Sequence, residues 1–275
     1  MMPLLAVLAI QAPDTAAYTP ARCPPCAEWN EPAPPARLFG NTWYVGTRGL
    51  TALLITSDSG HVLLDGGLPE SAPHIMRSIR ALGFRVEDVR VIGNSHAHHD
   101  HAGGLAALQR VSGAEVVALP RAVPVLRSGR RAGDDPQDTM LRDFPPVRRV
   151  RLLADGGVIT LGALRVTAHA TEGHAPGGTT WTWQACEGDR CLQFVYGDSQ
   201  SALAAPGTAF PAGTREHFER GFRLLGGLRC DILVTPHPGA SNLFGRMTGG
   251  SLIDGEACRR YASSARERLP AVIRP

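Results

Sequence analysis

Short apolar runs alternate with turn-rich stretches along most of the chain. Residues 53–56 and 61–64 are two such runs, and the tetrapeptide between them consists of Ser, Asp and Gly. This pattern predicts a β-hairpin. Further strand-like runs are found at residues 41–45, 89–92, 116–119, 147–153, 158–160, 164–168, 179–183, 192–196 and 232–234.

Helical spacing of apolar residues separates these strand-like runs. Ile75, Ile79 and Leu82 mark one helical face, and further helices are predicted over residues 105–110, 215–225 and 254–268. Residues 130–146 are charged and contain proline, which predicts a surface loop. Strand clusters interrupted by helices in both halves favour an α/β fold of two packed sheets with helices outside, and no internal repeat supports the division.

The N-terminal region differs from the rest. An apolar run over residues 3–10 is too short to cross a bilayer but suits a secretory signal, although the first basic side chain is Arg22. We therefore predict a signal peptide over residues 1–17, an extended Pro- and Ala-rich arm over 18–40, and one domain over 41–275. The protein is expected to be periplasmic or secreted, without a membrane span.

Composition narrows the function classes. The hydrophobic share of 43% and the charged share of 19% are those of an ordinary globular protein. The net charge is only +3, and the basic residues are scattered rather than gathered into a stripe with aromatic residues. A nucleic-acid partner is therefore not expected. Nothing in the sequence indicates an oligomer, so a monomer is the default expectation.

Six cysteines fit an oxidising compartment. Cys186 and Cys191 flank a turn-like tetrapeptide between two strand-like runs, which makes a hairpin-closing disulfide sterically easy. Cys23 and Cys26 form a Cys-Pro-Pro-Cys stretch that superficially matches a redox motif. No strand and helix surround it, so a local disulfide or two free thiols are the favoured alternatives.

The segment after the strand at 89–92 carries the most unusual chemistry. His96, His98, Asp100 and His101 follow the pattern His-x-His-x-Asp-His. Two residues apart in extended chain, His96 and His98 project to the same side and can share one metal ion. Asp100 and His101 lie where the backbone turns, so they can bind a second ion beside the first. One motif can thus begin two metal sites.

Zinc is the metal that several imidazoles and one carboxylate favour, and a catalytic zinc ion usually has three protein ligands. Two such sites need six donors. His174 and His237 lie in Gly- and Pro-rich loops that follow predicted strands, and they are the candidates for the two missing ligands. The sequence therefore predicts two Zn²⁺ ions per chain.

Four motifs together resemble the successive motifs of subclass B3 metallo-β-lactamases. They are His-Ala-His-His-Asp-His at residues 96–101, Glu-Gly-His-Ala-Pro-Gly-Gly-Thr-Thr-Trp at 172–181, Gly-Asp-Ser-Gln-Ser at 197–201 and Pro-His-Pro-Gly-Ala-Ser-Asn at 236–242. The resemblance implies an αββα sandwich of two mixed β-sheets flanked by helices. Gln200 stands where an apolar residue is more usual, and His99 occupies a variable position.

The resemblance also implies roles for individual residues. The first zinc would be held by His96, His98 and His174, and the second by Asp100, His101 and His237. The family further implies a disulfide between Cys230 and Cys258 and a substrate-binding role for Ser199 and Ser201, beside the second zinc and the substrate carboxylate.

The implied activity is hydrolysis of the amide bond of β-lactams, namely penicillins, cephalosporins and carbapenems, by a zinc-bound hydroxide. Asp100 would bind the second zinc and orient the hydroxide, which makes it the candidate catalytic residue. No Ser or Cys nucleophile is required. The sequence does not indicate which β-lactam class is preferred.

Two alternatives remain open. In other two-zinc hydrolases of this fold, such as thioesterases or lactonases, an Asp bridges both metals, and Asp198 resembles that residue. A non-catalytic zinc-binding protein would instead have closed ligand shells. Asp65 is expected to be a buried structural carboxylate. We expect no metal ligation by His61, His74, His99, His169 or His217. Only His169 is considered as a residue that contacts and supports one of the metal ligands.

Overall fold

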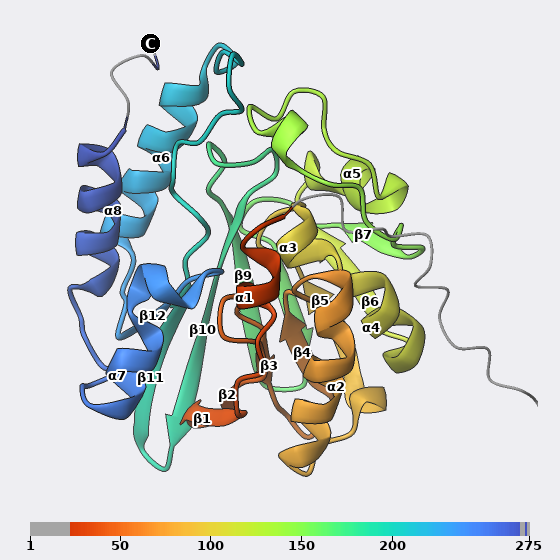
Figure 1. Cartoon of the computed structure of the whole chain (residues 1–275). Helices are drawn as coiled ribbons and strands as arrows, with labels where there is room; N and C mark the ends of the chain where they lie inside the picture. The colour runs from red at the N-terminus through yellow and green to blue at the C-terminus, as the bar shows by residue number, and fades with distance from the viewer. Residues whose placement is uncertain (1–22, 270–272, 274–275) are drawn as a thin grey trace, which may run out of the picture.

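The computed structural model describes residues 23–269 and Ile273. The predicted signal peptide and residues 18–22 of the arm lie outside the described residues. Two β-sheets pack face to face, and helices cover both outer faces (Figure 1). This arrangement confirms the αββα sandwich of two mixed sheets.

The larger sheet has seven strands in the order of the sequence. They are β1 (Ala36–Phe39), β2 (Thr42–Tyr44), β3 (Leu53–Ile55), β4 (His61–Leu64), β5 (Val89–Gly93), β6 (Glu115–Ala118) and β7 (Val150–Leu152). Neighbouring strands from β1 through β4 pair antiparallel, and neighbouring strands from β4 through β7 pair in parallel. The antiparallel pair β3–β4 confirms the predicted hairpin.

The smaller sheet has five strands in the order β12-β11-β10-β9-β8. Their bounds are β8 (Val158–Leu161), β9 (Leu164–Ala170), β10 (Thr179–Glu187), β11 (Arg190–Tyr196) and β12 (Ile232–Val234). The pairs from β8 to β11 are antiparallel, and β12 joins β11 in parallel.

Helices on the two sides belong to different halves of the chain. The seven-stranded sheet is covered by α2 (Ala72–Ala81), α4 (Leu105–Ser112) and α5 (Ala122–Ser128), and the five-stranded sheet by α6 (Thr214–Gly227) and α8 (Ala257–Glu267) (Figure 1). Shorter helices are α1 (Cys26–Trp29), α3 (His99–Ala102) and α7 (Leu243–Thr248), with 3₁₀ turns η1 (Pro69–Ser71), η2 (Val86–Asp88), η3 (Asp138–Met140) and η4 (Pro238–Ser241). In the described part of the chain, every helix is too short or too polar to span a bilayer.

The side-chain alternation of the strands separates the core into layers. On β3, Leu53 and Ile55 point into the core between the two sheets, and Leu54 points to the helices on the outer face. Trp181 and Trp183 of β10 are fully buried between the sheets. Burying a side chain of this size contributes on the order of 1.5–3 kcal/mol or more, so the sheets form a rigid base for the loops at their edge.

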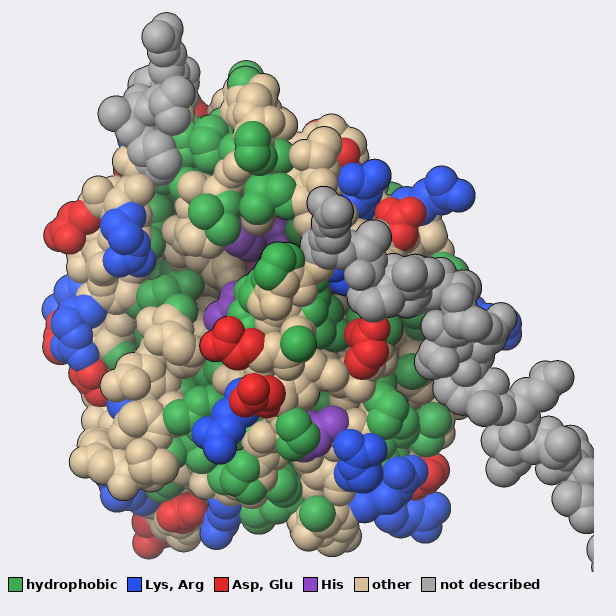
Figure 2. Space-filling view, in the orientation of Figure 1, with side chains coloured by type: hydrophobic (Ala, Val, Ile, Leu, Met, Phe, Trp, Pro, Cys, Tyr) green, Lys and Arg blue, Asp and Glu red, His purple; other side chains and the backbone are tan. Residues whose placement is uncertain are grey.

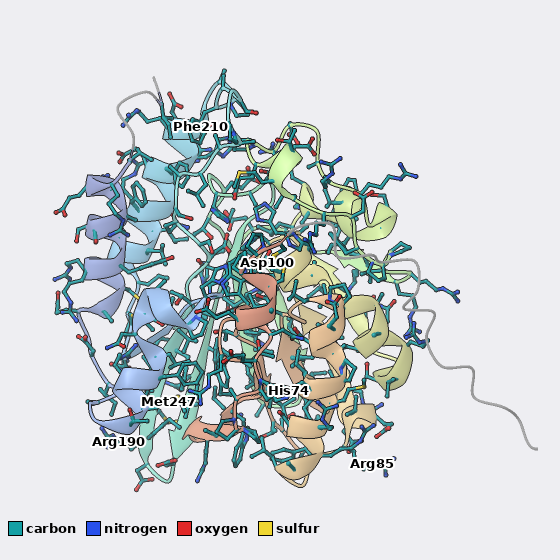
Figure 3. All side chains as sticks on the ribbon, viewed as in Figure 1. His74, Arg85, Asp100, Arg190, Phe210 and Met247 are labelled. Atoms are coloured by element: carbon teal, nitrogen blue, oxygen red, sulfur yellow. A yellow bond between two sulfur atoms is a disulfide. The ribbon has the colours of Figure 1, made fainter. Side chains whose placement is uncertain are left out.

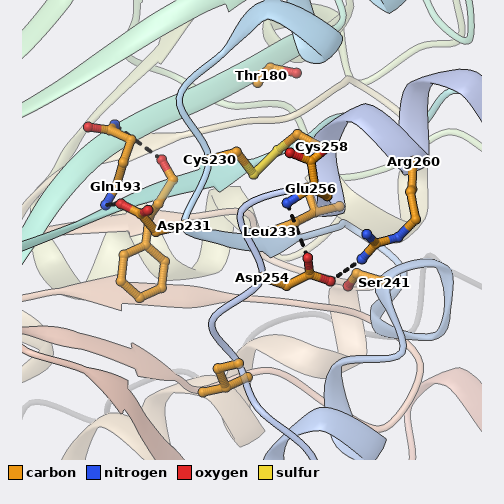
Figure 4. The surroundings of a disulfide bond; sticks show 12 residues. Thr180, Gln193, Cys230, Asp231, Leu233, Ser241, Asp254, Glu256, Cys258 and Arg260 are labelled. Carbon is orange, nitrogen blue, oxygen red and sulfur yellow. Dashed lines mark hydrogen bonds and ion pairs between the residues drawn. A yellow bond between two sulfur atoms is a disulfide. The ribbon is translucent and has the colours of Figure 1, made fainter.

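All six cysteines are paired. The Cys186–Cys191 disulfide closes the β10–β11 hairpin, as the spacing predicted. The Cys230–Cys258 disulfide connects the chain before β12 to α8 (Figure 4). Cys23 and Cys26 form a local disulfide at the start of α1, which decides between the two alternatives that the sequence left open.

The described part of the N-terminal arm is not a continuous extended segment, so that prediction was wrong for residues 23–40. It contains the one-turn helix α1 and the edge strand β1. Pro24 and Pro25 stand directly before α1, where proline is tolerated because the first N–H groups of a helix are unpaired anyway. An element of only four residues has too little periodicity to be recognised in a sequence.

Candidate metal centre

The loop after β5 is held in place by a buried carboxylate. Asp65 follows β4 with a left-handed φ of 62° and accepts hydrogen bonds from the Ser95 N–H (2.6 Å), the Ser95 hydroxyl (2.6 Å) and the Asn94 amide (3.0 Å). The Tyr196 hydroxyl donates to it from the other sheet (2.7 Å). Asp65 is fully buried, and burial raises its pKa. It is therefore the structural carboxylate that the sequence predicted, and it connects both sheets to the histidine-rich loop.

Three imidazoles form the first cluster, which we call the first triad: His96, His98 and His174. Their ligand atoms all lie within 4.8 Å of one another. The ring centroids of His96 and His98 are 4.5 Å apart, and those of His96 and His174 are 4.8 Å apart. All three rings are buried. The structure thus brings together the three residues predicted as ligands of the first zinc ion.

Each ring of the first triad is fixed through the nitrogen that faces away from the cluster. His96 Nδ1 donates to Asp198 Oδ1 (2.8 Å), and His98 Nε2 donates to Asp135 Oδ2 (2.8 Å). The Nδ1 of His174 donates to the carbonyl oxygen of Ser201 (2.8 Å). A partner on one ring nitrogen fixes the tautomer, so the other nitrogen is left with its lone pair for a metal ion.

The second cluster, the second triad, consists of Asp100, His101 and His237. Its ligand atoms also lie within 4.8 Å of one another. Asp100 Oδ2 is 3.3 Å from the Nε2 atoms of both His101 and His237. His237 Nδ1 donates to the carbonyl oxygen of Gly49 (3.1 Å), and the ring packs on Trp29 of α1 at a centroid distance of 4.9 Å.

The two triads are neighbours. The rings of His96 and His101 have centroids 4.4 Å apart, so one residue of each triad lies against the other. Asp100, which belongs to α3, lies near the centre of the view in Figure 3. Histidine side chains are visible at the bottom of a hollow in this face (Figure 2). The centre is therefore reachable from solvent at the edge of the two sheets.

Burial and mutual proximity set the charge state of the ligands. Burial, together with the nearby imidazoles of His101 and His98, lowers the pKa of His96 well below its ordinary value. Burial and His98 lower the pKa of His174 to about 3. Burial alone would raise the pKa of Asp100, but His101 and His237 outweigh it and hold that pKa well below the usual range. Neutral imidazoles beside an ionised carboxylate are the forms that bind a metal ion.

The donors fit two zinc ions. Among the described residues, His96 Nε2 is a buried nitrogen without a hydrogen-bond partner, and it points into the first triad. Leaving such an atom unpaired is costly, so its position is explained by a metal ion. Three imidazoles in one set, and two imidazoles with a carboxylate in the other, are typical zinc ligands with a fourth position left for water or substrate.

Asp198 does not bridge the two triads. Its Oδ1 is bound to the outward nitrogen of His96, and its Oδ2 faces Gly178, where a Cβ atom would come within 2.4 Å of that oxygen. Burial raises the pKa of Asp198 well above its ordinary value. The carboxylate therefore supports a ligand from behind and is outside both groups of possible ligands.

The serines differ in their positions. Ser201 is exposed, and its hydroxyl lies 3.1 Å from His174 Nδ1, so it is beside the first triad. The resemblance had implied serines beside the second zinc. Ser199 is buried two residues earlier. Their substrate-binding role stays a prediction.

The other histidines lie outside both triads. Their contacts are with Ser57 (His61), Gly46 (His74), Thr182 (His169) and Glu172 (His217). The His169 ring is 2.8 Å from the Thr182 hydroxyl on β10, so it does not support a ligand. His99 is buried beside the Cys23–Cys26 disulfide.

Sequence reasoning missed two residues of the centre. Asp135 lies in a loop with several acidic residues, and no spacing relates it to His98. Trp29 precedes its partner His237 by more than two hundred residues, within a segment predicted to be extended. Both contacts depend on how distant loops meet at the edge of the sheets, which no local pattern encodes.

Comparison with known proteins gives consistent results. The family model of the metallo-β-lactamase superfamily matches residues 45–186. The structure is similar to that of the Rm3 metallo-β-lactamase, with 51% identity, a TM-score of 0.87, and coverage of 90% of this chain and 96% of that one. It is also similar to MEM-A1, described as a subclass B3 metallo-β-lactamase isolated from a soil metagenome library, with 46% identity, a TM-score of 0.84, and coverage of 88% and 96%.

A curated relative with a different activity matches over a shorter region. The hydroxyacylglutathione hydrolase of Anaeromyxobacter dehalogenans (strain 2CP-C) is 30% identical over 131 residues. The match covers 48% of this chain and 41% of that protein. This similarity therefore concerns part of the fold, whereas the two solved structures match across nearly their whole length.

Proposed function

The chain belongs to the metallo-β-lactamase superfamily and, within it, to subclass B3, and on this premise we propose that it hydrolyses the amide bond of β-lactams with two zinc ions. The observation that carries the proposal is the pair of adjacent triads, with every imidazole except that of His101 held from behind by a hydrogen bond. His96, His98 and His174 would hold one zinc ion, and Asp100, His101 and His237 the other.

Zinc ions bound there would supply Lewis-acid activation of water and of the substrate carbonyl near neutral pH. The side chains of the protein prepare the site for this chemistry. Asp198, Asp135 and the Ser201 carbonyl orient the first triad, so that its imidazoles need no rearrangement when substrate binds. The pKa of Asp100 is held well below its usual range, so its carboxylate is the group that can orient an attacking water molecule.

Substrate binding is proposed for Ser199 and Ser201. Ser201 is exposed beside the first triad, and its hydroxyl can donate to a carboxylate such as the one that β-lactams carry. The His237 side chain is 34% exposed, so the second triad opens to solvent. An open second site supports a hydrolase rather than a zinc-storage protein, in which the ligand shells would be closed.

A thioesterase or lactonase is the competing function. Its expected feature is an Asp that bridges both metal sites, and the position of Asp198 behind His96 does not support it. We also propose a periplasmic or secreted location. The three disulfides support an oxidising compartment. The signal peptide over residues 1–17, a monomeric state and the domain bounds of 41–275 remain predictions.

The experiment is a substrate panel on purified, zinc-loaded protein. A chromogenic cephalosporin, a penicillin, a carbapenem, a glutathione thioester and a homoserine lactone are each assayed with and without a chelator. We expect chelator-sensitive turnover of the β-lactams that exceeds turnover of the thioester and the lactone. Preferential turnover of the thioester or the lactone would overturn the proposal, as would β-lactam turnover that the chelator does not affect.

A further inference from the structure

A third cluster of metal-capable side chains lies beside the second triad. It consists of Cys23, Cys26 and His99, whose two sulfur atoms and one ring nitrogen all lie within 4.8 Å of one another. This is the same proximity that the two zinc triads show. The cysteines belong to the start of α1 and His99 to the first turn of α3, so the cluster joins two elements that are far apart in the sequence.

His99 is the unexplained residue of this cluster. Its side chain is only 9% exposed, and both of its ring nitrogens lack a hydrogen-bond partner among the described residues. Its Nδ1 atom is 4.0 Å from Asp100 Oδ1, which is beyond hydrogen-bond distance. A buried imidazole with two unpaired nitrogens is costly, and it indicates a ligand that the disulfide-bonded state does not provide.

We propose that Cys23, Cys26 and His99 form a third, thiol-dependent site for a soft divalent cation such as Zn²⁺. Two cysteines separated by two residues have the spacing of structural zinc sites, and two thiolates with one imidazole are a known set of protein ligands for zinc. The fourth position would be open to water. The proposal does not depend on β-lactam hydrolysis, because the cluster shares no residue with either triad.

Metal binding requires that the disulfide is reduced first. A thiol or phosphine reductant supplies two electrons to the Cys23–Cys26 bond, and two protons complete the two thiols. Zn²⁺ then displaces one proton from each thiol, and His99 contributes its lone pair without releasing a proton. Cys23 and Cys26 are partly exposed, so a small reductant can reach them.

The charge balance explains why the site would bind metal only when reduced. A disulfide carries no charge, and the negative charge of Asp100 and the positive charge of Arg142 act on His99 in opposite directions. Reduction adds two potential thiolates, whose negative charges attract and balance the charge of a bound divalent cation. The metal would then take over the role of the disulfide and hold the start of α1 close to α3.

Cobalt substitution tests the site with a readout that is independent of catalysis. The full protein is loaded with Co²⁺ before and after treatment with a phosphine, and its near-ultraviolet absorption is recorded with the metal content. A thiolate ligand gives a charge-transfer band, whereas imidazole and carboxylate ligands do not. We expect the band and one additional metal equivalent per chain only in the reduced protein.

The other disulfides require a control background. Cys186 is exposed, so its bond with Cys191 would also be reduced, whereas Cys230 and Cys258 are buried. The experiment is therefore done in a C186S/C191S variant, in which the β10–β11 backbone pairing still holds the hairpin. In this background, Cys26→Ser removes one thiolate, and His99→Phe replaces the imidazole with an apolar ring.

The outcomes separate the proposal from simple thiol binding. We expect Cys26→Ser to abolish the band and His99→Phe to weaken cobalt affinity at this site at least tenfold, with cobalt in the two triads unaffected. An unchanged metal count after reduction would overturn the proposal. The proposal would also be overturned if His99→Phe showed the band with unchanged cobalt affinity, because the two cysteines would then bind the metal without His99.

Discussion

The two triads use similar side chains, but the protein supports them differently. In the first triad, all three rings are buried and two are held by buried carboxylates. In the second, His237 is 34% exposed and is held by one backbone oxygen and by the ring of Trp29. Ligands that are fixed before the metal arrives lose less entropy on binding. We therefore expect the first triad to bind zinc more tightly than the second.

The difference also follows from where the supporting residues lie in the fold. Asp198 follows β11, an interior strand of the smaller sheet. Trp29 belongs to a single turn of helix near the N-terminus. The second site is thus attached to a less extensively packed part of the molecule, and changes in α1 are expected to affect it first.

Asp100→Ala should have the largest effect, because it removes a ligand of the second zinc and the candidate catalytic carboxylate together. We expect kcat/KM for a cephalosporin to fall roughly 10³-fold or more, with zinc content reduced from two ions to one. Steady-state kinetics and metal analysis of the same preparation check both. Retention of two zinc ions with normal activity would contradict the assignment of Asp100.

Acid should destabilise the metal-free protein through its buried neutral imidazoles. Burial lowers the pKa of His174 to about 3 and that of His99 to about 4, below their ordinary value of 6.5. At these two rings the unfolded chain therefore binds more protons between about pH 6.5 and 4, so their contribution to stability is lost as pH falls through this range. The shift of His99 alone corresponds to about 3 kcal/mol.

Urea unfolding of the metal-free protein at pH 7, 6 and 5 measures this dependence. We expect the fall of the urea midpoint towards pH 5 to be smaller in His99→Phe than in the unchanged protein, because the variant lacks one of the imidazoles that must stay neutral. An equally steep pH dependence in His99→Phe and in the unchanged protein would mean that the His99 ring is not held neutral by burial.

Asp198→Asn and Asp135→Asn test the support of the first triad. Loss of the carboxylate behind a ligand should lower zinc affinity at the first triad about 10–100-fold, since such partners orient the imidazole and raise its basicity. Competition with a chromophoric chelator gives the affinity. Asp134→Asn is a matched control, because Asp134 lies in the same loop but pairs with Arg121 at the surface. Equal effects of Asp134→Asn and Asp135→Asn would contradict the assignment.

Trp29→Ala should have the smallest effect and should be confined to the second triad. An aromatic contact contributes about 0.5–1.5 kcal/mol, so zinc affinity at the second triad should fall about 2–10-fold. Trp43→Ala is the control, because Trp43 packs on Phe84 away from the centre. Weakening of the first zinc site instead would show that α1 does not act through His237.

Much of the fold could be predicted from the sequence. Short apolar runs marked every strand from β2 to β12, and the motif at residues 96–101 marked the metal centre. The helices α5 and α7 were not predicted, since α5 contains Pro124 and α7 has only six residues. Periodicity identifies long elements with one buried face, and these two are too short or too irregular for that.

Within the centre, the ligands could be predicted and their supports could not. The ligands share residue types and close spacing, whereas Asp135 and Trp29 reach the site through loops of distant origin. Asp198 was recognised as important, but only the geometry placed it behind His96 rather than between the metals. The surroundings of a ligand depend on tertiary packing, so a sequence pattern does not determine them.

The most direct test is anomalous diffraction at the zinc edge from crystals of the zinc-loaded protein. Our account predicts two peaks, one bound by His96, His98 and His174 and the other by Asp100, His101 and His237, with Asp198 bound to neither. The first peak should keep full occupancy at a zinc concentration that leaves the second incomplete. A single peak, or a metal ion bridged by Asp198, would contradict it.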